Sequence, residues 1–143
     1  MQNNIFNTIE NPPNSRGIFY LRTFFLLVLF YFGTESLIAQ AKIKFEDAKK
    51  NFGFVTKGEV VSMDYTFINE GNAPLIISET KVECSCTSVD FPKQPIAPKQ
   101  SGKITVKFDT KTVYDRQDRI VEVISNASNS PAKIRFKGVV LKK

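Results

Sequence analysis

The feature of this sequence that most constrains its fold is a period-two alternation of apolar and polar side chains. The cleanest example lies in residues 103–109, where Ile104, Val106 and Phe108 alternate with charged or hydroxyl-bearing residues. The same spacing recurs in residues 61–67 and 132–140. Alternation of this kind places apolar side chains on one face of a half-buried strand. No stretch shows a convincing 3.6-residue repeat, so the pattern predicts an all-β protein.

Turn signals divide residues 42–143 into about seven short strands, a number typical of a single immunoglobulin-like β-sandwich. The antibody signature is absent, because the chain has no Trp and its two cysteines lie only two residues apart. An aliphatic and aromatic core must therefore hold the sandwich together. The predicted core consists of Phe45, Phe54, Met63, Tyr65, Phe67, Leu75, Ile77, Ile104, Val106, Phe108, Val121, Val123, Ile134 and Phe136.

Three segments between the clearest strands carry specific expectations. Residues 75–77 follow the turn at residues 69–72 and are predicted to form a strand. Residues 91–101 contain three prolines, which favours a stiff connection that crosses between the two sheets. Residues 110–118 are predicted to form a polar loop.

The N-terminal 41 residues have the pattern of an export signal. Arg16 and Arg22 precede an uncharged apolar run at residues 24–32, and the segment ends on Ala39-Gln-Ala41, a small-x-small cleavage motif. We expect cleavage after Ala41, a mature domain over residues 42–143, and a periplasmic or extracellular location. The alternative is an uncleaved membrane anchor, but the run is shorter than the roughly 20 apolar residues that span a bilayer.

Composition argues against an enzyme. The chain has a net charge of +6 and no histidine, so no side chain titrates near neutral pH by default. General acid and base chemistry would require a shifted carboxylate or thiol. We therefore predict no catalytic residues and no cofactor.

The candidate site is the pair Cys84 and Cys86, and four interpretations are open. In the first, the cysteines are small buried thiols or form a local disulfide. In the second, they bind copper(I), with Met63 as the other sulfur ligand. In the third, they take part in redox chemistry or form an intermolecular crosslink. A zinc site would need a dimer that pools its thiols. In a regular strand the two Cα atoms would lie about 6.6 Å apart, so a disulfide requires a kink at Ser85.

Several stretches together resemble the bacterial exported family called domain of unknown function 1573. They are residues 52–59, 67–77, 84–87, 95–98 and 104–109, of which the Asn-x-Gly-x-x-Pro-Leu turn and the following Cys-x-Cys-Thr step are the most specific. The family is frequent in Bacteroidetes. The resemblance implies a fold similar to major sperm protein and cilia-associated modules, and no established catalytic role. Ser85 and Lys99 stand where the family usually has Gly.

The predicted function is an exported, non-catalytic interaction or structural module of the bacterial cell envelope, and the alternative is a thiol-based metal or redox function. The partner is expected to be a protein or another envelope component rather than nucleic acid, and membrane contact is expected only through an uncleaved signal. Basic residues on the last strand, with Lys103 and Lys107, could form a positive sheet face that binds anionic glycans or membrane surfaces, or only a solvated face.

Overall fold

The computed structural model describes residues 39–142, and these form strands and loops without a helix. The strands are β1 (Ile43–Phe45), β2 (Lys49–Thr56), β3 (Val60–Asn69), β4 (Ile77–Val82), β5 (Thr87–Asp90), β6 (Ser101–Asp109), β7 (Asp115–Ser125) and β8 (Ala132–Leu141). The all-β prediction is confirmed, with one strand more than expected. Within the described range, no helix reaches the length and apolar character needed to cross a bilayer. The predicted signal lies outside this range except for residues 39–41.

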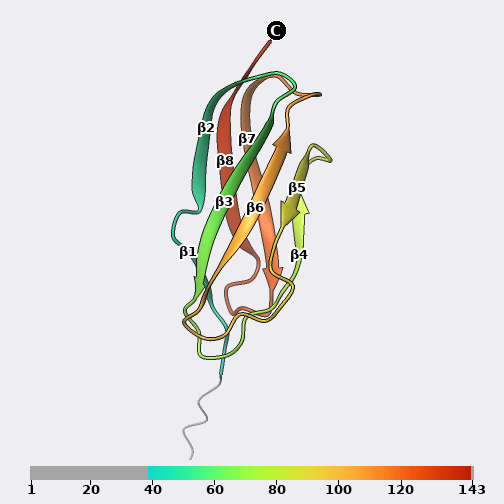
Figure 1. Ribbon diagram of the computed structural model, residues 1–143. Coiled ribbons are helices and arrows are strands. Elements are labelled where there is room, and N and C mark those ends of the chain that lie inside the picture. The colour runs from blue at the N-terminus through green and yellow to red at the C-terminus, as the bar shows by residue number, and fades with distance from the viewer. Residues whose placement is uncertain (1–38, 143) are drawn as a thin grey trace, which may run out of the picture. The chain divides into compact units, whose positions relative to one another are not determined.

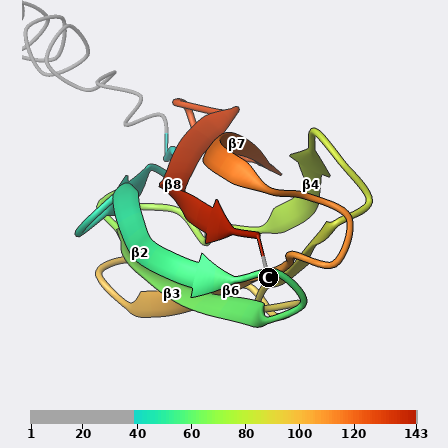
Figure 2. The same ribbon diagram turned by 90° about the horizontal axis from the view of Figure 1, so that it is seen from above.

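The strands form two four-stranded sheets that pack face to face, as Figures 1 and 2 show. One sheet has the order β1-β3-β6-β5 and the other β2-β8-β7-β4. All neighbouring strands are antiparallel except β2 and β8, which run parallel at one edge of the second sheet. The predicted immunoglobulin-like sandwich is therefore confirmed.

The core lies between the sheets and contains the inward residues of the alternating strands. Phe108 of β6 and Phe136 of β8 are fully buried, and their ring centroids lie 5.2 Å apart across the two sheets. The hydroxyl of Tyr65 in β3 donates a hydrogen bond of 3.0 Å to the carbonyl oxygen of Arg135 in β8. Burial raises the pKa of Tyr65, and the charge of Asp47 adds to the effect, so this inter-sheet donor stays protonated.

The prediction that Phe54 is a core residue is wrong. Its side chain is 75% exposed, whereas Phe52 packs its ring 5.8 Å from that of Phe108. The reason is a bulge in β2, where the pairing with β8 shifts between Asn51 and Gly53 and Gly53 adopts a φ of 75°. In a regular strand these two phenylalanines would face the same side, so the extra residue of the bulge is what turns Phe54 to the outer face while Phe52 faces the core.

The prediction of a strand over residues 75–77 is also wrong. The strand β4 begins only at Ile77, and Leu75 instead forms an isolated bridge with Ile96 through two backbone hydrogen bonds of 2.9 and 2.8 Å. Ile96 belongs to the proline-rich connection. The side chain of Leu75 is nonetheless fully buried, as predicted.

The proline-rich connection does not cross between the sheets as expected. It joins β5 to β6, which are neighbours in the same sheet. The preceding connection, between β4 and β5, does cross between the sheets, and it contains both cysteines. The sequence showed β5 poorly, because only residues 87–90 pair and they form the outer edge of their sheet.

The predicted polar loop over residues 110–118 is shorter than expected. The strand β7 begins at Asp115, and its first four residues pair with β8 although all four are polar or charged. Gln117 is buried here, and its amide nitrogen donates a hydrogen bond of 2.8 Å to the carbonyl oxygen of Tyr114. The period-two alternation of apolar and polar residues is weak at the start of β7, because the side chain buried there, Gln117, is polar.

The turn after β3 is organised by the buried side chain of Asn69. Its amide nitrogen donates to the carbonyl oxygens of Ala73 and Ile96, at 2.8 and 3.0 Å. Its side-chain oxygen accepts from the backbone N–H groups of Gly71 and Lys42, at 3.0 and 3.3 Å. A single fully buried side chain therefore connects the turn, the proline-rich segment and the start of the domain.

The sandwich includes residues that precede the predicted cleavage point. Ala41 is buried, and its carbonyl oxygen accepts a hydrogen bond of 2.9 Å from the N–H of Ser128. Gln40 exchanges two hydrogen bonds with Asn72, of 2.7 and 3.0 Å. A Cβ atom on Gly71 would collide with the carbonyl oxygen of Gln40, so this close approach requires glycine. Gln40 and Ala41 therefore contact the folded sandwich, and a domain boundary at Lys42 stays a prediction.

A chain that begins at Lys42 should be less stable than one that begins at Gln40, by about 1–3 kcal/mol in the free energy of unfolding. The shorter chain lacks the hydrogen bonds to Asn72 and Ser128 and the buried methyl group of Ala41. Denaturant unfolding of the two chains measures the difference, and a chain that begins at Ala39 should match the one from Gln40. Equal midpoints for all three would show that these contacts contribute nothing.

Cleavage after Ala41 remains a prediction, which intact-mass analysis of the exported protein checks.

Candidate functional site

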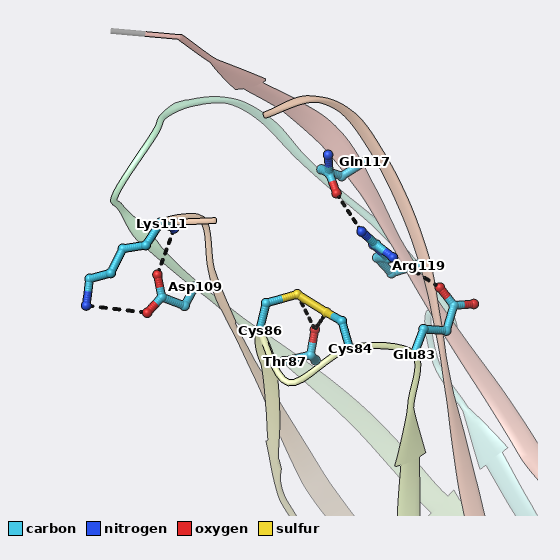
Figure 3. Close-up of a disulfide and its surroundings, with 8 residues drawn as sticks. All are labelled: Glu83, Cys84, Cys86, Thr87, Asp109, Lys111, Gln117 and Arg119. Carbon is cyan, nitrogen blue, oxygen red and sulfur yellow. Dashed lines mark hydrogen bonds and ion pairs between the residues drawn. A yellow bond between two sulfur atoms is a disulfide. The ribbon is translucent and has the colours of Figure 1, made fainter. Parts of the chain in front are cut away.

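The two cysteines form a disulfide in the turn that carries the chain from one sheet to the other (Figure 3). Their Cα atoms lie 5.2 Å apart, closer than the spacing in a regular strand. The backbone N–H of Thr87 donates a hydrogen bond of 3.2 Å to the carbonyl oxygen of Cys84, which closes the turn around Ser85. The expected kink at Ser85 is therefore present, and of the four interpretations the structure contains the local disulfide.

The disulfide lies at the boundary between the core and solvent. Both cysteines are half-buried and Ser85 between them is exposed. Cys86 packs against the core, and its carbonyl oxygen accepts a hydrogen bond of 2.8 Å from the N–H of Asp109 at the end of β6. The hydroxyl oxygen of Thr87 lies 3.6 Å from the sulfur of Cys84 and 4.0 Å from that of Cys86. The disulfide is thus held against the fold through Cys86, while the residue at the tip of the turn, Ser85, is exposed.

Charged side chains surround the turn in Figure 3, and each has a partner. Arg119 of β7 lies 3.6 Å from the carboxylate of Glu83 and donates a hydrogen bond of 3.1 Å to the side-chain oxygen of Gln117. Lys111 forms an ion pair of 3.5 Å with Asp109. The charges beside the disulfide are therefore balanced in pairs.

The arrangement allows thiol–disulfide exchange more readily than metal binding. Both sulfurs are joined to each other, so neither is a free thiolate that could bind copper. Met63, the other sulfur considered, is buried in the core on β3. Among the described residues, no group of three or more His, Cys, Asp or Glu side chains could hold a metal ion. What remains is attack on a half-exposed disulfide by an external thiolate.

Replacing both cysteines by Ala should lower the free energy of unfolding by less than about 2 kcal/mol, because the bridge closes a very small loop in the unfolded chain. Replacing both by Ser should have a similar effect, since half-exposed hydroxyl groups can reach water. Chemical denaturation of the two double variants beside the wild type measures this. A large loss in both variants would show that the pair is a main support of the fold.

The basic residues do not share one sheet face as considered above. Lys103 and Lys107 lie on β6 and point outward from one sheet, where they pair with Asp64 at 3.1 Å and Asp90 at 3.8 Å. The basic residues of the last strand lie on the other sheet, on the opposite side of the sandwich. That sheet also presents basic residues of β2 and β7, which the sequence did not group with them because strand neighbours cannot be read from spacing along the chain.

On the outer face of β8, the basic residues differ in their pairing. Lys133 pairs with Glu122 at 3.1 Å, and Arg135 forms two hydrogen bonds with the carboxylate of Asp118. These hydrogen bonds lower the pKa of Asp118, so the pair is charged at neutral pH. Lys137 has no carboxylate partner among the described residues.

Comparison with known families identifies the fold and the family. The sequence model of the family described as "protein of unknown function (DUF1573)" matches residues 43–140. The chain belongs to this family. The resemblance inferred from the sequence is thereby confirmed, whereas no curated protein sequence matches the chain.

Solved structures with low sequence identity show similar folds. A protein of unknown function from Porphyromonas gingivalis W83 has a TM-score of 0.64 at 16% identity, over 76% of this chain and 51% of its own. The VesB protease of Vibrio cholerae has a TM-score of 0.57 at 20% identity, over 71% of this chain and 32% of its own. The ASH/PapD-like domain 7 of human CEP192 has a TM-score of 0.56 at 9% identity, over 99% of this chain and 96% of its own. This member of DUF1573 thus spans about half of the first relative and about a third of the second, and the likeness establishes the fold alone.

Proposed function

We propose that this member of DUF1573 is an exported, non-catalytic interaction module of the bacterial cell envelope. The observation that carries the proposal is the disulfide between Cys84 and Cys86, which lies half-exposed at the sheet crossing. Disulfides of this kind persist in the periplasm and outside the cell and are reduced in the cytosol. The apolar run followed by Ala39-Gln-Ala41 supports the same location.

The non-catalytic part of the proposal is supported by the fold and by the ionisable groups. Among the described residues, three carboxyl groups have a shifted pKa, and in each the pKa is lowered by hydrogen bonds from threonine, lysine or arginine side chains. They are Asp64, Glu70 and Asp118. Such shifts keep carboxylates ionised rather than making acids that act near neutral pH. The match to VesB covers 32% of that protease, and it does not extend protease activity to this chain.

Export can be tested with the full chain carrying a C-terminal tag in a Gram-negative host. We expect the protein in the periplasmic or extracellular fraction, with a shortened N-terminus and with both cysteines unreactive to alkylation until a reductant is added. A control chain that lacks residues 1–38 should stay in the cytosol, with both cysteines alkylated. Full-length protein with free thiols in the cytosol would refute the proposal.

Thiol–disulfide exchange is a second candidate function, favoured by the half-exposed sulfurs. In this reaction a thiolate of a reduced dithiol partner attacks one sulfur, and the disulfide between Cys84 and Cys86 breaks to give a mixed disulfide and one free thiolate. The second thiolate of the partner then attacks the mixed disulfide, which leaves the partner with a disulfide and both Cys84 and Cys86 as thiols. The same exchange runs in reverse, so in a Cys86→Ser variant the remaining thiolate of Cys84 should attack the disulfide of an oxidised envelope protein and hold it as a mixed disulfide, because no second thiol can release it. Absence of trapped adducts, with an intact disulfide throughout growth, would leave the bridge a structural element only.

A further inference from the structure

The outer face of the second sheet carries basic residues from three neighbouring strands. The register places Arg116 of β7 beside Val139 of β8, Lys137 of β8 beside Asn51 of β2, and Lys49 of β2 beside Arg135 of β8. Arg116, Lys137 and Lys49 therefore follow a diagonal across the sheet, one residue on each strand. From strand geometry, successive Cα atoms along this diagonal lie about 8 Å apart.

These three side chains are exposed cations without carboxylate partners among the described residues. The one carboxylate in their midst, Asp118, is already bound by Arg135. Lys50 also lines the larger of the hollows on this face, but its ammonium lies 5.6 Å from the centre of the Tyr65 ring of β3, so it is not counted with the three. The charge of this face is therefore not neutralised within the described domain, and it favours an anionic ligand.

Two hollows of ≈ 260 Å³ and ≈ 200 Å³ lie along the diagonal and share Arg116 and Lys137 in their walls. The smaller hollow also contains Gly53 and Gly138, which face each other across β2 and β8. A Cβ atom on Gly53 would meet nothing within 4 Å, so its side of the sheet is open. The bulge that exposes Phe54 thus also leaves space beside the cations.

Phe54 supplies an apolar wall to this basic area. Its side chain is 75% exposed and, with Val139 and the amide of Asn51, borders the smaller hollow. An exposed aromatic next to cations and an amide presents a flat apolar surface together with charged and neutral donors. Sugar rings have matching apolar faces and hydroxyl groups, and acidic sugars add a carboxylate that Arg binds through two parallel hydrogen bonds.

A third hollow on the same sheet provides a contrast. It is lined by Lys81 and Lys133 and by Glu83 and Glu122, so its charges are balanced. The excess of positive charge is therefore confined to the half of the sheet formed by β2, β8 and the start of β7. A charge spread evenly for solubility would not be concentrated in this way.

We propose that this surface, formed by Lys49, Phe54, Arg116 and Lys137, binds an anionic polysaccharide that carries carboxylate groups. The diagonal of separate cations suits an extended polymer rather than a single small anion. The inference rests on the proposed function, because an exported protein meets such polymers in the envelope and outside the cell. It adds to that function the chemical class of the partner.

Binding of the purified chain to polygalacturonate, with uncharged dextran as the reference polymer, tests the proposal at about 0.1 M salt. We expect the double variant Arg116→Ser/Lys137→Ser to bind polygalacturonate at least about tenfold more weakly than the wild type. Phe54→Ala should weaken binding about threefold or more, because it removes the apolar wall and no charge. Uncharged dextran should not bind.

The matched control is the double variant Lys103→Ser/Lys107→Ser on the outer face of the other sheet, which removes the same amount of charge. It should keep polygalacturonate affinity within about twofold of the wild type. An equal loss in both double variants would show a general charge effect and would overturn the proposal. Binding to single-stranded DNA or to phosphatidylglycerol vesicles, without binding to polygalacturonate, would also overturn it.

The two proposals can fail separately. An exported chain that does not bind polygalacturonate refutes the polysaccharide site and leaves the envelope module standing. A chain that stays in the cytosol with free thiols refutes the proposed function whatever the polymer assay shows. Each variant is also examined by circular dichroism. If its β spectrum matches that of the wild type, a loss of binding comes from the changed surface and not from unfolding.

Discussion

Replacing Phe108 by Ala should lower the free energy of unfolding by about 3–5 kcal/mol. Phe108 is fully buried on β6, an inner strand of its sheet, and its ring packs against Phe136 at 5.2 Å and Phe52 at 5.8 Å from the opposite sheet. The substitution therefore leaves a cavity at the place where the two sheets meet. Urea unfolding of the variant and the wild type, followed by circular dichroism, measures the change.

The neighbouring substitution Lys107→Ala is the control for this prediction. Lys107 lies on the outer face of the same strand, and its ion pair with Asp90 at 3.8 Å is exposed. Such a pair contributes little, so we expect a change of less than about 0.5 kcal/mol. Similar losses in the two variants would contradict the register of β6, since a shift of one residue exchanges the two faces.

Replacing Asn69 by Leu should lower the free energy of unfolding by about 2–4 kcal/mol, although the two side chains are similar in size. The variant removes the partners of the Ala73 carbonyl and the Gly71 N–H, and one of the partners of the Ile96 carbonyl. These groups lie in or beside the core, where water cannot fully replace the lost hydrogen bonds. Equilibrium unfolding in urea again gives the value.

Asn72→Ala provides the comparison for Asn69 within the same turn. The side-chain oxygen of Asn72 accepts a hydrogen bond from the N–H of Gln40 at an exposed position. Its removal should cost less than about 1 kcal/mol, because water can take its place. If Asn72→Ala were as damaging as Asn69→Leu, the turn would depend on its backbone conformation and not on the buried amide.

The strands that were predicted best are those whose burial alternates without interruption. In β3 the residues Met63, Tyr65 and Phe67 are buried as expected, and in β8 the same holds for Ile134 and Phe136. Alternation is a local property of an extended chain, so it can be read without knowing the neighbouring strands. The turn at Asn69 and the kink at Ser85 were also recognisable, because their residue types have specific backbone requirements.

The incorrect predictions share a cause, which is a local pattern overridden by pairing with a distant strand. Phe52 and Phe54 lie on opposite faces, although they are two residues apart, because a bulge opposite β8 shifts the register of β2. The apolar Leu75 favours a strand in the local pattern, but its backbone pairs with Ile96 in the proline-rich segment. Lys99 has a positive φ of 66°, a backbone conformation that glycine adopts most easily. This agrees with the family pattern, which usually has glycine at the position of Lys99.

The sequence by itself determined the all-β class, the family and the inward faces of the long strands, whereas it left the state of Cys84 and Cys86 open until the structure showed the disulfide. Each of these depends on residues close together in the chain. Only the tertiary structure decided that the cysteine turn connects strands of different sheets, and that Lys49, Arg116 and Lys137 meet on one outer face beside Phe54. The physical reason is that the order of strands in a sheet is set by packing and hydrogen bonding between segments far apart in sequence, which no local pattern contains.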